Sequence, residues 1–242
     1  MKWRWRKKNV VDALLIILVV HTVGLFLGAM FLILRLLRRI KVVHSERLPH
    51  WQKNMLIVSN HPSLIETILL PNLLLGENLL HPLQFLPVST PDKKNFYDPW
   101  WFFWLRPVSI PIDRDNSRSR DPLRAMLDVL QSGKRLILFA EGGRTFKGKD
   151  FVLSTKGRRM RQLVNGAGLL ATKARSMVLP IWVGGAEHKS FNDFFLLLGL
   201  WGFWRYRITI KIGQPFFVDE KLGAKDATRQ IQSKLLELAD EE

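Results

Sequence analysis

The amino-acid sequence predicts an α/β fold, with a mostly parallel mixed sheet flanked by helices and preceded by an N-terminal membrane-embedded helical segment. The first observation is that short β-branched runs alternate with helical stretches beyond residue 40, which is typical of a largely parallel sheet. The second is a long apolar run near the N-terminus, and the third is a formal net charge of +16 over 242 residues. That charge favours an anionic partner: nucleic acid, an anionic membrane surface or an acidic carrier. We therefore divide the chain into a basic, hydrophobic anchoring segment, 1–40, and an α/β domain, 41–242.

The N-terminal segment has the length and composition of a membrane anchor. From Ala13 to Leu34 it carries no formal charge apart from the titratable His21, and as a helix it would reach roughly 33 Å, enough to cross a bilayer core. It ends in arginines rather than in a small-residue cleavage site, which argues against a secretory signal peptide. Basic residues flank both ends, so two arrangements stay open: one spanning helix, or two short helices that bend near Gly24 and Gly28 and return to the same face.

The elements of the α/β domain follow from local sequence pattern. Short runs of β-branched and apolar residues predict strands over 40–45, 55–59, 83–88, 136–140, 178–184 and 207–213. Stretches with helical periodicity predict helices over 62–74, 122–130, 166–174 and 224–238. In sheets of this kind, ligands bind beyond the carboxyl ends of the strands. The residues that follow each strand are therefore the candidates for a functional site.

A histidine and a carboxylate follow the second predicted strand. Pro62 fits the first position of the next helix, which places His61 at the strand-to-helix corner and Glu66 one turn into the helix. The carboxylate can then hydrogen-bond one ring nitrogen of His61 and leave the other to accept a proton from a substrate hydroxyl. The alternative is a capping or core histidine near an ordinary helix acid.

Two further stretches carry an arginine at a turn. The fourth predicted strand runs directly into Glu141-Gly142-Gly143-Arg144-Thr145, where the glycines let the backbone approach a ligand and the arginine offers two parallel donors to a phosphate. Upstream, Arg114 follows a short apolar run. Either stretch alone also fits a turn with a surface arginine. Their meaning depends on their occurring together.

Four blocks of residues, in order along the chain, resemble the glycerolipid acyltransferase family, whose best-known members are the 1-acylglycerol-3-phosphate acyltransferases: 60–66, 112–114, 139–145 and 178–181. The resemblance implies that His61 is the general base and that Glu66 orients it. It also implies an acceptor site, shaped by Pro180, that contains Arg114, Glu141, Gly142, Gly143, Arg144 and Thr145. The family usually has Asp five residues after the histidine, and this sequence has Glu there, which loosens any inference about the acceptor.

The reaction implied by the resemblance is transfer of a fatty acyl group from a thioester, on acyl-carrier protein or acyl-CoA, to the free hydroxyl of 1-acylglycerol 3-phosphate (lysophosphatidate), giving phosphatidic acid. We expect no cofactor and no metal, and the absence of cysteine excludes a cysteine nucleophile and a thiolate zinc site. The expected partners are the donor, the acceptor and an anionic phospholipid membrane, without nucleic acid. We expect the protein at the cell membrane, with its active site on the cytoplasmic face.

Two alternatives to this function stay open at this point. One is an acyltransferase for another acceptor, such as glycerol 3-phosphate or a different lysolipid. The other is a non-enzymatic, membrane-tethered binding module whose basic patch is Lys156, Arg158, Arg159 and Arg161. Two aromatic stretches, 100–104 and 194–204, fit either a core or an extension of the membrane-facing rim, and we favour the rim.

Overall fold

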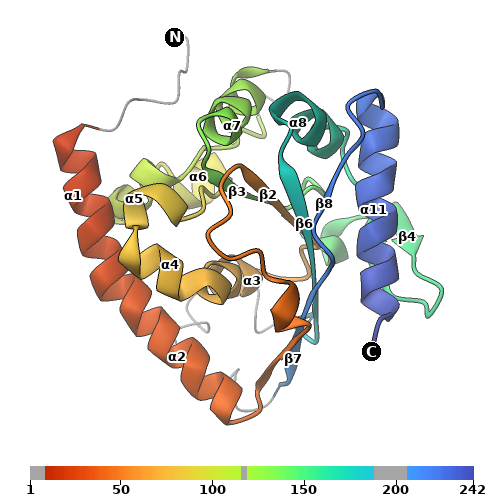
Figure 1. Ribbon diagram of the computed structural model, residues 1–242, viewed down its shortest axis with the longest axis horizontal. Helices are drawn as coiled ribbons and strands as arrows, with labels where there is room; N and C mark the ends of the chain where they lie inside the picture. The colour runs from red at the N-terminus through yellow and green to blue at the C-terminus, as the bar shows by residue number, and fades with distance from the viewer. Residues whose placement is uncertain (1–8, 116–118, 188–205) are drawn as a thin grey trace.

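A mixed sheet forms the centre of the protein (Figure 1), which a computed structural model describes over residues 9–115, 119–187 and 206–242. The strand order is β1-β7-β6-β2-β3, and the short strand β8 also pairs with β6. The strands are β1 (Ile40–Val43), β2 (Met55–Ser59), β3 (Arg135–Leu138), β6 (Met177–Gly184), β7 (Ile208–Ile212) and β8 (Phe216–Phe217). Strand β2 is parallel to β3 and β6, and β1 is parallel to β7, whereas β6 runs antiparallel to β7 and β8. The predicted mostly parallel mixed sheet is therefore confirmed.

Helices cover both faces of this sheet, because consecutive residues of a central strand point to opposite sides. From β2, Leu56 and Val58 pack in one core with α7 (Asp121–Gln131), α8 (Gly166–Ala174) and α11 (Ala224–Asp240). Met55 and Ile57 pack in a second core on the other face, with the N-terminal helix, α3 (Glu66–Leu69) and the 3-10 segment η3 (Leu70–Leu74). The two cores place the sheet in the middle layer of three.

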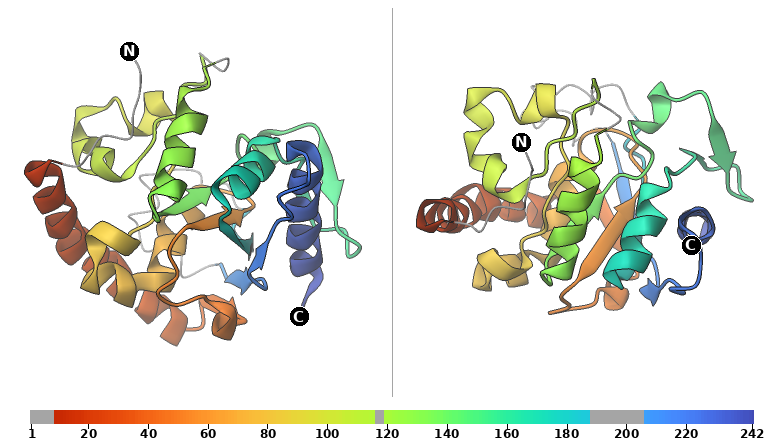
Figure 2. Two further views of the ribbon diagram at one scale, coloured as in Figure 1. Left: turned by 45° about the horizontal axis from the view of Figure 1, so that its top comes forward. Right: turned by 90° about the horizontal axis from the view of Figure 1, so that it is seen from above.

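Shorter elements complete the described chain. They are η2 (Ser45–Arg47), α4 (Leu75–Leu80), α5 (Pro82–Phe85), α6 (Lys93–Phe96), the 3-10 segments η4 (Trp100–Val108) and η5 (Thr145–Lys147), and the antiparallel hairpin of β4 (Phe151–Leu153) and β5 (Arg159–Arg161). The hairpin projects beside α11, as both views in Figure 2 show. Asp240 at the end of α11 holds its turn, since its carboxylate accepts hydrogen bonds from the Ser154 and Thr155 hydroxyls, each 2.6 Å long.

Within the N-terminal segment, residues 10–36 form one continuous helix. The helices α1 (Val10–Val19) and α2 (Leu25–Leu36) are joined by a π-helical turn, η1 (Val20–Gly24), and together they are long and apolar enough to cross a membrane. The chain does not reverse at Gly24 or Gly28, so the predicted alternative of two helices returning to the same face does not describe this structure. The helix lies along one edge of the molecule, opposite α11 (Figure 1).

One face of this helix packs against the domain. Ile16, Val20, Phe31 and Leu34 are buried there, and Gly28 lies so close to Leu75 that an added Cβ would stand 2.2 Å from Leu75 Cδ2. The opposite face exposes large apolar side chains, including Leu18 and Phe26. The segment therefore has a domain-facing stripe and a solvent-facing apolar stripe on the same helix.

Two of the predicted elements are wrong. The predicted strand over 83–88 is helical over its first half, as part of α5, and only Val88 makes a bridge to Leu136 of β3. An apolar run of this length fits either structure, and Pro82 favours the helix because its fixed φ suits a first helical position. The predicted helix over 62–74 begins at Glu66 rather than at Pro62. Here the Ser63 hydroxyl accepts a bond from the Ile65 amide and donates one to Glu66, local bonds that compete with the helix.

Candidate active site

The loops that follow β2 and β3 meet at one edge of the sheet, next to the end of β6. Asn60, the first residue after β2, ties its loop to β6 through two side-chain bonds: its amide group donates to Val183 O over 2.8 Å and accepts from Val183 N over 2.7 Å. The main chain of His61 is fixed in turn by Thr145, whose N–H donates to His61 O over 2.8 Å. The candidate site is therefore assembled from three segments that are far apart in the sequence.

The predicted pair of His61 and Glu66 is present. His61 Nδ1 lies 2.5 Å from Glu66 Oε1, and both side chains are largely or fully buried. Ser63 fixes the carboxylate, because its N–H donates to Oε1 over 3.1 Å and its hydroxyl donates to Oε2 over 2.7 Å. The His61 ring stacks on Phe139 with 4.5 Å between centroids. Since Nδ1 is engaged, Nε2 is the ring nitrogen that can meet a substrate hydroxyl.

Glu141 lies at the centre of the site, but its oxygens are occupied by donors of the protein. It is 1% exposed, and it accepts hydrogen bonds from His61 N over 2.6 Å, from Arg161 N over 2.8 Å and from the Thr145 hydroxyl over 2.9 Å. Burial raises the pKa of this carboxyl above its ordinary value, and the three hydrogen-bond donors oppose that shift. The resemblance implied that Glu141 and Thr145 belong to the acceptor site, whereas their geometry is that of supports for the loops.

The two arginines implied in phosphate binding lie within electrostatic reach of each other. Arg114 Nε is 3.0 Å from Asp92 Oδ2, and the Arg144 guanidinium lies over the Phe146 ring, 5.2 Å from its centroid. Burial lowers the pKa of Arg144, the positive charge of Arg114 lowers it further, and the negative charge of Glu66 opposes both. The charges of Glu66 and Arg114 therefore both act on the Arg144 guanidinium.

The two glycines of the loop serve different purposes. Gly142 has a φ of +68°, in the left-handed region where a side chain is strained. Gly143 faces two arginine side chains, because an added Cβ would stand 2.8 Å from Arg161 Nη1 and 3.9 Å from Arg114 Nη1. Arg161 was predicted only as part of a basic surface patch. That patch is divided in the structure, since Lys156 pairs with Glu242 and Arg159 lies over the Phe151 ring, while Arg161 faces Gly143.

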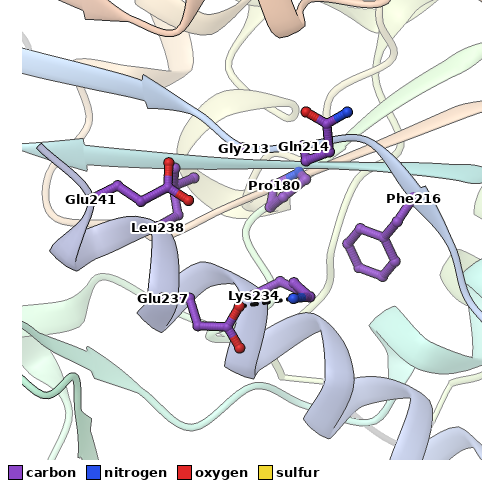
Figure 3. Close-up of a pocket in the computed structure, with 8 residues that line it drawn as sticks. All are labelled: Pro180, Gly213, Gln214, Phe216, Lys234, Glu237, Leu238 and Glu241. Carbon is purple, nitrogen blue, oxygen red and sulfur yellow. Dashed lines mark hydrogen bonds and ion pairs between the residues drawn. The ribbon is translucent and has the colours of Figure 1, made fainter.

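Pro180 is not brought to His61. Its side chain lines a different pocket of about 190 Å³ between the sheet and α11, where Gly213, Gln214 and Phe216 face Lys234 and Glu237 (Figure 3). Pro180 also packs against the α carbon of Gly213, where an added Cβ would stand 2.6 Å from the proline ring. The implied role of Pro180 in shaping the acceptor site therefore finds no support in its position.

Comparison with known proteins adds a family to this geometry. The structure is similar to that of the 1-acyl-sn-glycerophosphate (LPA) acyltransferase PlsC from Thermotoga maritima, with a TM-score of 0.55 and 18% sequence identity over 97% of each chain. At that identity, the likeness shows a shared fold. A family model described as Acyltransferase matches residues 39–184, which is more than half of the chain and contains all the site residues described above. The enzyme class predicted from the sequence is confirmed, and the chain belongs to the acyltransferase family.

Proposed function

We propose that this acyltransferase transfers a fatty acyl group from an acyl thioester, on acyl-carrier protein or CoA, to the free hydroxyl of 1-acylglycerol 3-phosphate, giving phosphatidic acid. The observation that carries the proposal is the buried His61–Glu66 pair within electrostatic reach of Arg144, which in turn is close to Arg114. A general base beside positive charge suits an acceptor that bears both a hydroxyl and a phosphate. The name of the Thermotoga protein describes the same acceptor class.

The proposed mechanism needs no enzyme nucleophile. His61 Nε2 takes the proton of the acceptor hydroxyl while Glu66 stabilises the imidazolium through Nδ1. The acceptor oxygen attacks the thioester carbon, and the tetrahedral intermediate collapses as the carbon–sulfur bond breaks. The proton on His61 then passes to the departing thiolate. The products are the new ester and a free thiol, and the enzyme returns to its starting protonation state.

A panel of acceptors tests this proposal. Purified protein is incubated with one acyl thioester and, in separate reactions, lysophosphatidate, glycerol 3-phosphate and a neutral lysolipid, with acyl-carrier protein and CoA donors compared. We expect the highest specificity constant with lysophosphatidate, because only that acceptor combines a phosphate with an apolar chain. Equal or better turnover of the neutral lysolipid would contradict the proposal.

Replacing Arg114 or Arg144 with Ala should weaken acceptor binding without a matching effect on the donor. The expected loss in acceptor specificity constant corresponds to about 1.5 to 3 kcal/mol for each, the range for hydrogen bonds to charged groups, and Lys should restore it only in part. Arg229→Ala is the control, because it removes an exposed charge on α11 away from the site. Thermal melts run beside the kinetics separate binding from stability: early melting with unchanged acceptor kinetics would make these arginines structural.

We also propose that residues 1–40 form the anchor of the acyltransferase domain, 41–242, at a membrane surface. The exposed stripe of the N-terminal helix supports this, and α1 packs beside η4, which exposes Trp100, Trp101 and Phe103. One of the two aromatic stretches expected at the membrane-facing rim, 100–104, therefore lies beside the N-terminal helix. The other stretch, 194–204, lies outside the described residues. We place the active site on the cytoplasmic face, because the donors are soluble thioesters.

Charging the exposed stripe should release the full-length protein from vesicles. Leu18 and Phe26 are 60% and 66% exposed, so their double replacement by Asp leaves the packed face intact while opposing burial in lipid. The measurement is co-sedimentation with anionic vesicles at high salt, which screens the basic residues and leaves the apolar contribution. Leu153→Asp, at an equally exposed apolar residue of β4, is the control. Unchanged sedimentation of the double variant would place the main anchor elsewhere.

A further inference from the structure

Arg161 is attached to the active site through its main chain. It ends strand β5 of the hairpin, and its N–H donates to Glu141 Oε2 over 2.8 Å. The other oxygen of the same carboxylate accepts the N–H of His61 over 2.6 Å. One buried carboxylate thus holds the main chain at two positions. One is His61, the proposed general base, and the other is Arg161.

From β5, the Arg161 side chain extends past two glycines and lies close to both. A Cβ added to Gly148 would stand 2.4 Å from Arg161 Cδ and Nε, and one added to Gly143 would stand 2.8 Å from Nη1. The aliphatic stem therefore occupies the place of one missing side chain, and the guanidinium lies at the other. Gly148 has a φ of −84° and a ψ of 166°, which any residue adopts, so its need for glycine comes from the arginine and not from the backbone.

Positive charge converges where this side chain ends. A Cβ added to Gly143 would stand 2.8 Å from Arg161 Nη1 and 3.9 Å from Arg114 Nη1. The two nitrogens are therefore no farther apart than the sum of these two distances. Arg144 is close enough to Arg114 for its pKa to be lowered by that charge. Within the described residues, no carboxylate is in ion-pair contact with the Arg161 guanidinium. Guanidinium groups that approach one another in this way are stabilised by a bound anion.

We propose that Arg161 is a third guanidinium of the acceptor site, that it contacts the phosphate directly, and that it makes the site selective for a phosphate monoester over a phosphodiester. A monoester carries a second negative charge and a third terminal oxygen that a diester lacks, and a third guanidinium matches both. Gly143 and Gly148 are the residues that leave room for it. The inference rests on the proposed function, since it names the part of the acceptor that this site binds.

Arg161→Ala and Arg161→Lys test the contact, with Arg159→Ala as the matched control on the same strand. We expect Arg161→Ala to raise the apparent Michaelis constant for lysophosphatidate about tenfold or more. The enzyme's preference for lysophosphatidate over a lysophosphodiester should become smaller, and the Michaelis constant for the acyl donor should stay unchanged. Lys should restore the constant only in part, because it lacks the bidentate fork. Arg159→Ala should behave as wild type. An unchanged lysophosphatidate constant in a normally melting Arg161→Ala protein overturns the inference.

Gly148→Ala provides a second, independent arm. In the wild-type background the new methyl group meets the aliphatic part of the Arg161 side chain. The apparent Michaelis constant for lysophosphatidate should therefore rise although Arg161 is present. In the Arg161→Ala background the same change should add nothing, because the atoms that it meets are gone. Additive effects in the two backgrounds would contradict the proposed placement of Arg161.

A binding measurement with inorganic phosphate distinguishes two outcomes: that the Arg161 inference is wrong, or that the proposed function is wrong. Phosphate should raise the melting temperature of the full-length wild type, and the rise should be reduced in Arg161→Ala and kept in Arg159→Ala. If wild type does not use lysophosphatidate but shows this pattern, the proposed acceptor is wrong and the anion site with Arg161 stands. If lysophosphatidate is used and Arg161→Ala retains both its kinetics and its phosphate response, the function stands and the Arg161 inference is wrong.

Discussion

His61→Ala should lower turnover at least about a hundredfold while the protein stays folded, because general-base assistance contributes that much or more. In the structure, the side chain makes its polar contact with Glu66 and stacks on Phe139, and it is not itself a member of either hydrophobic core, so we expect its removal to leave the fold in place. The measurement is the rate of thiol release from a saturating acyl thioester with lysophosphatidate. A thermal melt and a far-ultraviolet circular dichroism spectrum establish that the variant is folded.

His50→Ala is the matched control for this variant. His50 also pairs through Nδ1 with a buried carboxylate, Glu77 Oε1, at 2.8 Å, but it lies in the loop before β2, and among the described residues no hydrogen bond or ion pair joins its side chain to His61 or to residues 141–145. It should therefore keep near-normal turnover, which would show that loss of a histidine–carboxylate pair is not in itself inactivating. A folded His61→Ala protein with a near-normal rate would remove His61 from the mechanism.

Glu66→Gln should reduce turnover by roughly 10² to 10⁴-fold, and Glu66→Asp should retain more activity. Glutamine keeps the shape of the side chain but loses the negative charge that stabilises the imidazolium. Aspartate keeps the charge, but its shorter side chain cannot hold His61 and both Ser63 donors in the present geometry, because Glu66 is 0% exposed and fixed by all three contacts. The order expected in turnover is therefore wild type, Asp, Gln.

Ser63→Ala isolates the part of this effect that comes from geometry alone. It removes the hydroxyl that donates to Glu66 Oε2 and leaves the charge of Glu66 and its contact with His61 in place. We expect a loss smaller than that of Glu66→Gln. Equal turnover in wild type, Glu66→Asp and Glu66→Gln, at equal stability, would make Glu66 a structural residue.

Local pattern was enough to predict the sheet and its central helices. The run Met55–Val58 is apolar throughout because β2 is buried on both faces, and the helix over 166–174 is found with the predicted bounds. The His61–Glu66 pair could be predicted because both residues belong to one turn of chain. The two side chains are in contact although the helix begins at Glu66, since the loop, rather than the first helical turn, brings them together.

The remaining parts of the site depend on contacts between distant segments. No local signal shows that the Glu141 carboxylate turns inward to bind main-chain amides rather than outward to a ligand. The hairpin that carries Arg161 has short strands around polar and basic residues, so it resembles a surface loop in the sequence. The glycine at 148 was a signal of this arrangement, because glycine at an ordinary backbone conformation indicates close packing by another group.

The position of Glu141 also bears on when the candidate site is complete. Its carboxylate joins partners that are 80 residues away in one direction and 20 residues away in the other. Bringing those partners together costs chain entropy, which must be lost before the contact is gained. Until β2, β3 and the hairpin are all in place, the carboxylate has no complete set of donors. The candidate site is therefore complete only when all three segments are in place, and a chain in which one of them is displaced would keep its sheet but lose the arrangement around His61.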